Sequence, residues 1–80
     1  MDFSTFVISL GSSVLIQLGQ GDSDPIEGSL ELAQQSIDIL TMLETKTTGN
    51  LTVEESGLLT SVLYQTRLAY LDAKSSLESA

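Results

Sequence analysis

A short stretch in the middle of the chain, Ile37 to Glu55, contains a helix end, a tight turn and a new helix start. Lys46 places positive charge at the carbonyl end of the first helix, where the helix dipole favours it. Gly49 can adopt the left-handed backbone conformation that ends helices, and Asn50 extends the turn. This stretch therefore predicts two helices that are joined by very few residues.

The second of these helices begins with a capping box. The Thr52 hydroxyl is expected to accept a hydrogen bond from the backbone N–H of Glu55, while the Glu55 carboxylate accepts one from the N–H of Thr52. Because the connection is so short, the two helices must run antiparallel. The centre of the chain is therefore predicted to be a helical hairpin.

Apolar residues recur at helical spacing in three segments, which are residues 3–18, 25–46 and 53–76. Asp2 or Ser4 is expected to cap the first segment, and the second begins at Pro25 or at Ser29. We predict one all-α domain over residues 1–80, with an antiparallel hairpin, an uncharged N-terminal helix and completion by oligomerisation.

The composition excludes most catalytic and metal-binding chemistry. The 80 residues include no cysteine and no histidine, so thiolate ligands, disulfides and the usual general base at neutral pH are absent. The loop with Asp22 and Asp24 lacks the further oxygen donors of a calcium site, and we interpret it as solvated. We expect no enzyme activity, no cofactor and no bound metal.

The net charge is −8, because the chain has 11 acidic and only 3 cationic residues. The chain is therefore expected to repel nucleic acids and anionic lipid surfaces. No segment has the basic start, apolar core and cleavage site of a signal peptide. We therefore expect a cytoplasmic protein that is bacterial in style, with no nucleic-acid partner.

The first predicted helix has no charged residue between Asp2 and Asp22. Its apolar stripe consists of Phe3, Phe6, Val7, Leu10, Val14 and Leu18. Such a helix suits a central position, a subunit interface or a membrane segment, but its serines, threonine and glycines dilute the apolar run that spanning requires. Gly11 destabilises a helix interior, so we expect either the close approach of another helix at Gly11, Ser12 and Ser13 or a kink.

The third predicted helix carries two separate apolar stripes. The broad stripe is assigned to the hairpin core and consists of Leu58, Leu59, Val62, Leu63, Thr66, Ala69, Tyr70 and Ala73. The second stripe is Val53, Gly57, Tyr64, Leu68 and Leu71, in which Gly57, Tyr64 and Leu71 recur every seven residues. A lone hairpin can cover only one of these stripes.

This surplus of apolar surface predicts a homo-oligomer, because small chains commonly add subunits to complete a core. The candidate interface comprises Phe3, Phe6, Val7, Leu10, Gly11, Val14, Gly57, Tyr64, Leu68 and Leu71. The alternative is that the first helix folds across its own hairpin and buries the surplus internally. Arg67 lies beside the second stripe, where it either pairs with Glu54 or Asp72 of another subunit or is solvated.

Several sequence segments resemble a known family. They are Asp2–Ser13, Ile37–Leu40, Leu43–Glu44, Lys46–Thr47, Gly49–Thr52 and the later positions Leu58, Leu59, Leu63, Arg67 and Tyr70. Over nearly its whole length the chain is similar to a bacterial family of small helical proteins known as domain of unknown function 1844. The resemblance implies a short α-helical protein and supplies no catalytic residues, and many members of that family have extra residues before the run that begins at Asp2.

We therefore interpret the chain as a non-enzymatic, self-associating interaction module, with an unidentified protein as a second candidate partner. The alternative is a membrane-surface protein that uses the N-terminal helix as an in-plane anchor.

Overall fold

The computed structural model describes residues 2–19 and 29–79. Within these residues it contains no strand and three helices, which are α1 (Phe3–Gln17), α2 (Ser29–Lys46) and α3 (Val53–Ser79). The prediction of an all-α chain is confirmed. The alternative start of the second helix at Pro25 lies outside the described residues, and α3 continues past the predicted end near residue 76.

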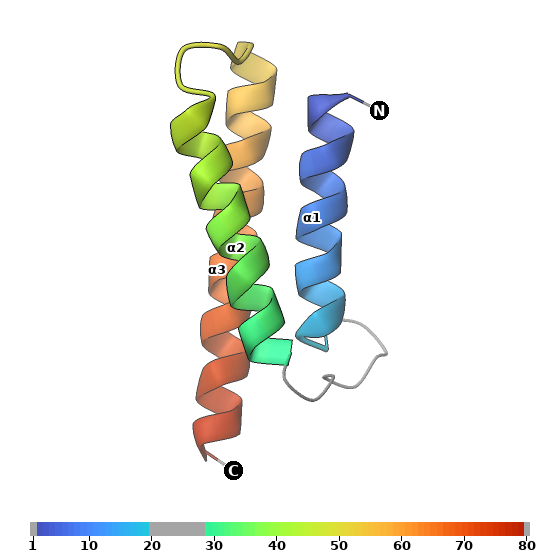
Figure 1. Cartoon of the computed structure of the whole chain (residues 1–80). Helices are drawn as coiled ribbons and strands as arrows, with labels where there is room; N and C mark the ends of the chain where they lie inside the picture. The colour runs from blue at the N-terminus through green and yellow to red at the C-terminus, as the bar shows by residue number, and fades with distance from the viewer. Residues whose placement is uncertain (1, 20–28, 80) are drawn as a thin grey trace.

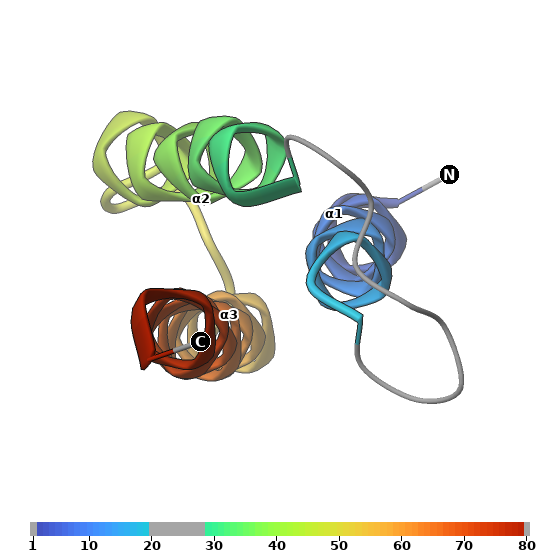
Figure 2. The same cartoon turned by 90° about the horizontal axis from the view of Figure 1, so that it is seen from below.

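The three helices form an up-down-up bundle. Figure 1 shows α1 and α3 running in one direction and α2 running in the other, so α2 and α3 are the predicted antiparallel hairpin. In Figure 2 the helices stand at the corners of a triangle, and each helix contacts the other two. The C-terminal turns of α3 extend beyond α1 and α2, which contributes to the long dimension of 43 Å.

The core consists of two groups of buried side chains along the bundle axis. One group is Val7, Leu40, Leu59, Val62 and Leu63, and the other is Val14, Leu18, Ala33, Ile37 and Ala69. Each of the three helices contributes side chains to both groups, from different turns of the helix. The broad apolar stripe of the third helix, from Leu58 to Ala73, is buried or partly buried as a whole.

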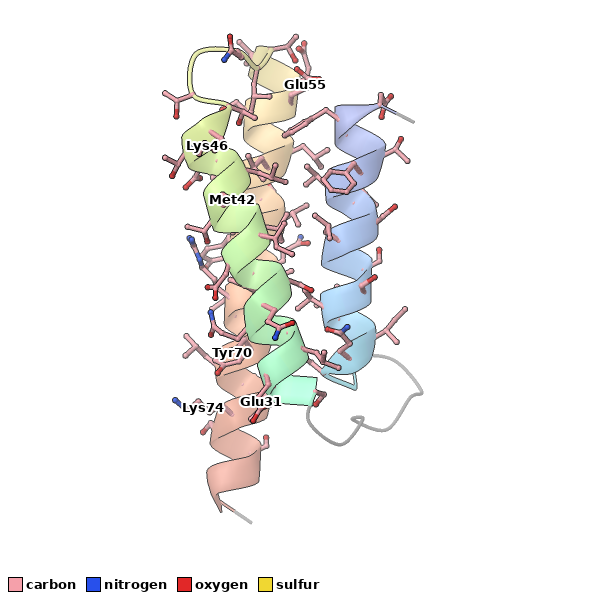
Figure 3. All side chains as sticks on the ribbon, viewed as in Figure 1. Glu31, Met42, Lys46, Glu55, Tyr70 and Lys74 are labelled. Atoms are coloured by element: carbon pink, nitrogen blue, oxygen red, sulfur yellow. The ribbon has the colours of Figure 1, made fainter. Side chains whose placement is uncertain are left out.

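The turn between α2 and α3 has the local structure that its residues predict. Gly49 adopts a left-handed conformation with φ of +83°. Thr52 and Glu55 exchange both hydrogen bonds of a capping box, at 2.9 Å from the Thr52 N–H to the carboxylate and 3.1 Å from the Glu55 N–H to the hydroxyl. The Asn50 N–H donates to the Thr47 carbonyl at 2.9 Å. Figure 3 places Lys46 and Glu55 at this end of the bundle.

Threonine hydroxyls provide an additional cap for α2. The Thr47 hydroxyl donates to the Leu43 carbonyl at 2.6 Å, and the Thr48 hydroxyl donates to the Glu44 carbonyl at 3.0 Å. The Leu43 carbonyl also accepts a hydrogen bond from the Thr47 N–H at 2.9 Å, whereas the Thr48 hydroxyl supplies the Glu44 carbonyl, in the last turn of α2, with a donor.

The N-terminus of α1 is capped by Asp2, whose carboxylate accepts a hydrogen bond from the Thr5 N–H at 2.8 Å. Hydrogen bonds from the side chain and the backbone of Thr5 lower the pKa of the Asp2 carboxyl, because they stabilise its charged form. Of the two predicted caps, Asp2 is therefore the one in use.

Gly11 lies at a close contact between α1 and α3. A Cβ atom at Gly11 would lie 2.7 Å from Cγ1 of Val62, which is too close for two carbon atoms. The approach of another helix explains this glycine, and the approaching helix belongs to the same chain. Ser12 and Ser13 do not take part as expected, because both are exposed.

We predict that Gly11→Ala lowers the stability of the fold. Alanine favours a helix by about 1 kcal/mol over glycine, but overpacking against a stiff β-branched side chain costs roughly 1–3 kcal/mol. We therefore expect a net loss in the free energy of unfolding, measured by denaturant titration at one low protein concentration. Adding Val62→Ala removes the clashing atom and should reduce the effect of the Gly11 change.

Gly57 is the matched control, because it is also a helical glycine but a Cβ atom there would meet nothing within 4 Å. Gly57→Ala should raise stability by about 0.5–1 kcal/mol. Equal stabilisation by the two alanine variants would show that the α1–α3 contact is looser than described.

We also predict that Thr52→Ala lowers the free energy of unfolding by about 1 kcal/mol, because it removes the side-chain acceptor at the start of α3. Thr52→Ser keeps this acceptor and should retain most of the stability. The measurement is thermal unfolding followed by circular dichroism. A serine variant that is as unstable as the alanine variant would argue against the cap as the cause.

Candidate functional site

The apolar stripe of α1 lies inside the bundle of its own chain. Val7, Gly11 and Val14 are buried, while Phe3 and Leu10 are partly buried and pack against the core. These side chains contact α2 and α3, so they are not available to another subunit in this arrangement. Phe3, Val7, Leu10, Gly11 and Val14 thus have the internal packing that was the alternative, and a subunit interface on the first helix stays a prediction.

Phe6 differs from the rest of that stripe, with an exposed fraction of 38%. Among the described residues of α1 that were predicted at the interface, Phe6 alone is exposed, and the others are buried or partly buried.

The second stripe of the third helix lies on the surface. We call the residues Val53, Gly57, Tyr64, Leu68 and Leu71 the outer face of α3. The exposed fractions are 87% for Val53, 65% for Tyr64, 49% for Leu68 and 61% for Leu71. Figure 2 explains this exposure, because α1 and α2 both pack on other sides of α3. The structure thus brings the candidate residues of α3 together on one exposed strip.

Apolar side chains are also exposed on the other two helices. They are Ile8 and Ile16 on α1 and Leu32, Ile39 and Met42 on α2, with exposed fractions between 40% and 56%. Scattered exposed apolar residues are common on protein surfaces. The outer face of α3 is distinguished by its higher exposure and by the regular spacing along a single helix.

The charges beside the outer face of α3 are balanced. Glu54 and Asp72 lie along one edge of the face, and Arg67 and Lys74 lie along the other, as their spacing on the helix requires. The chain has 3 cationic and 11 acidic residues, so two of its few cations border this face. Figure 3 shows Lys74 near the end of α3 that lies away from the turn. This strip is therefore less acidic than the molecule as a whole.

Arg67 makes a contact that the sequence did not indicate. Its Nη2 donates a hydrogen bond to the hydroxyl of Thr41 on α2 at 3.0 Å, and that hydroxyl donates to the Ile37 carbonyl at 2.9 Å. Arg67 is exposed and bridges the two helices of the hairpin, so it is not merely solvated. The contact depends on how α2 and α3 are aligned, which no local sequence signal gives.

Two shallow hollows occur in the described part of the surface. One, of about 190 Å³, lies between α1 and α3 and is lined mainly by apolar side chains such as Ile8, Leu15 and Leu58. The other, of about 210 Å³, lies beside the α2–α3 turn and is lined by Glu44 and several threonine and serine residues. Neither brings together the groups that general acid–base or nucleophilic catalysis requires.

Among the side chains of residues 2–19 and 29–76, no three acidic groups lie close enough together to hold a metal ion. The acidic loop with Asp22 and Asp24 lies outside the described residues.

The fold defines a small three-helix protein whose distinctive surface feature is an exposed apolar strip on its longest helix. Residues 1–72 match the family described as "Domain of unknown function (DUF1844)", so the chain belongs to that family. No curated protein and no solved structure matches it. Among the described residues, no helix has both the length and the apolar character needed to cross a bilayer.

We predict that Leu68→Glu is tolerated by the folded chain, whereas Ala69→Glu unfolds it. Leu68 is 49% exposed, but its neighbour Ala69 is only 9% exposed and packs with Val14 and Ile37. At a concentration at which the chain is monomeric, we expect Leu68→Glu to change the free energy of unfolding by less than about 1 kcal/mol. Burying an unpaired carboxylate at position 69 should cost about 3 kcal/mol or more.

Circular dichroism and denaturant titration of both variants would test this assignment. Complete unfolding by Leu68→Glu would show that Leu68 belongs to the core.

Proposed function

We propose that this protein is a non-enzymatic interaction module that associates with further copies of itself through the outer face of α3. The observation that supports the proposal is the exposure of Tyr64, Leu68 and Leu71 on one strip that neither α1 nor α2 covers. Exposed apolar strips of this kind usually mark contact surfaces. A tyrosine in the strip suits such a contact, because it combines a large apolar ring with a polar hydroxyl.

Association would remove these side chains from water. Burying a leucine fully contributes about 1.5–3 kcal/mol relative to leaving it exposed, and each copy presents two leucines and a tyrosine with exposed fractions from 49% to 65%. The contact is made by both copies in a symmetric dimer, so the same residues contribute twice. The strip is narrow, however, and the expected dimer is one whose population depends on protein concentration.

The charge distribution also favours this strip over the rest of the surface. Two copies that each carry a net charge of −8 repel each other in most orientations. Beside the outer face of α3, Arg67 and Lys74 offset Glu54 and Asp72. The copies therefore meet with least repulsion at this face.

The alternative function as an in-plane membrane anchor has less support. Such an anchor needs a free apolar face on the N-terminal helix, ideally with cationic residues beside it. In this chain Val7 and Val14 of α1 are fully buried against α2 and α3, and α1 has no basic residue in its last turn.

Gel filtration coupled to light scattering tests the proposal. We expect a mass above that of the 8.5 kDa chain at micromolar concentration, falling toward it on dilution. Leu68→Glu should give the mass of one folded chain, because it places a carboxylate in the centre of the contact.

Ile16→Glu is the matched control, because Ile16 is 56% exposed but lies on α1, away from the outer face of α3. This variant should associate as the original chain does. A single 8.5 kDa species for the unchanged chain throughout the micromolar range would refute self-association and would leave a different protein as the partner of this face.

A further inference from the structure

The outer face of α3 has edges that are not equivalent, and this limits how two copies can be arranged. Gly57, Tyr64 and Leu71 are spaced seven residues apart along a helix of 27 residues. Leu68 follows Tyr64 by four residues, so the strip has the apolar spacing of a coiled-coil seam. At 100° per residue, Arg67 and Asp72 are separated by about 140° around the helix axis, with the strip between them.

Symmetry determines which edges of two such helices meet. In an antiparallel pair each edge faces the same edge of the other copy, so the edge with Arg67 and Lys74 would meet itself. In a parallel pair each edge faces the opposite edge, so the cationic edge would meet the edge with Asp72, whereas Glu54, three residues before Gly57, would face the Glu54 of the other copy. Only the parallel arrangement therefore places Arg67 opposite an acidic side chain of the other copy.

The side chains along the two edges match in the parallel arrangement. A residue on the cationic edge faces the residue five positions later on the other copy, as in parallel coiled coils. This rule pairs the apolar Val53 with Leu58 and the charged Arg67 with Asp72 of the second copy. Thr60 and Gln65, which are both polar and exposed, form the pair between these two.

We infer that two copies of this chain pair through the outer face of α3 as parallel helices in register, with Arg67 of each copy bound to Asp72 of the other. This inference rests on the proposed self-association and specifies its geometry. Arg67 can take this role while it remains bound to α2, because a guanidinium has five N–H donors and only Nη2 is used by Thr41. Small residues at Gly57 and Ser61 allow the two helices to approach at their N-terminal ends.

Disulfide cross-linking tests the orientation, since the chain has no cysteine of its own. Gly57→Cys and Ser75→Cys place single thiols at exposed positions that lie about 27 Å apart along α3, at 1.5 Å per residue. A disulfide requires the two Cα atoms to be within about 7 Å. In a parallel pair each variant should therefore cross-link with itself upon oxidation, as seen by non-reducing electrophoresis.

The other outcomes separate the two proposals. Cross-linking only when the two variants are mixed would show an antiparallel pair, which overturns the orientation but keeps self-association. A light-scattering dimer without either cross-link would overturn the in-register pairing, and the mass of the Leu68→Glu variant would then decide whether the outer face of α3 is the contact. A monomer would refute both proposals. Ser9→Cys, which places an exposed thiol on α1, controls for collisions and should not cross-link.

Charge reversal tests the ion pair separately. Asp72→Arg places Arg67 opposite a second arginine in each half of the dimer, which should raise the dissociation constant roughly tenfold. Adding Arg67→Asp in the same chain restores opposite charges with their positions exchanged, so the dissociation constant should fall back. A double variant that associates no better than Asp72→Arg alone would contradict the pairing of Arg67 with Asp72.

Discussion

The contact between Gly11 on α1 and Val62 on α3 is the constraint on which the rest of the bundle depends. An isolated helix of 15 residues is marginal in water, and α1 has neither an acidic residue in its first turn nor a basic one in its last. Its helical state must therefore come from packing. The absence of a side chain at Gly11 lets α1 lie close to α3, where Val7 and Val14 become fully buried. The helix-destabilising effect of glycine is offset by this closer packing.

The position of α1 decides which apolar surface remains exposed. In a bundle of three helices each helix has two neighbours, so part of its circumference always faces outward. On α3 the inner side holds Leu59, Leu63 and Ala69, and the outer side holds Tyr64, Leu68 and Leu71. α3 has 27 residues and α1 only 15. A helix as short as α1 cannot cover the inner and the outer side of α3 along the whole length of α3, wherever it packs. The exposed strip is therefore a consequence of the helix lengths as well as of the sequence pattern.

The local features of the fold were predictable, because they depend on residues close together in the chain. The capping bonds join Thr52 and Glu55, three residues apart, and the turn depends on one glycine with a positive φ. The location of α1 was not predictable in this way, since the same apolar stripe suits contact with its own hairpin or with another subunit. The hydrogen bond from Arg67 to Thr41 joins residues 26 positions apart, so it depends on the alignment of two helices that no short pattern specifies.

Electrostatics gives the few cationic residues of this acidic chain an importance beyond their number. Repulsion between two chains of charge −8 acts over distances that salt shortens to about 8 Å at physiological ionic strength. Ion pairs formed at direct contact are screened less, so the arrangement of Arg67 and Asp72 retains its effect when the general repulsion is weakened. Arg67 is already held at the edge of the outer face by Thr41, and ordering it there in advance lowers the entropy lost when a second copy binds. In the proposed dimer, the hydrogen bond that joins α2 to α3 would thus also prepare α3 for association.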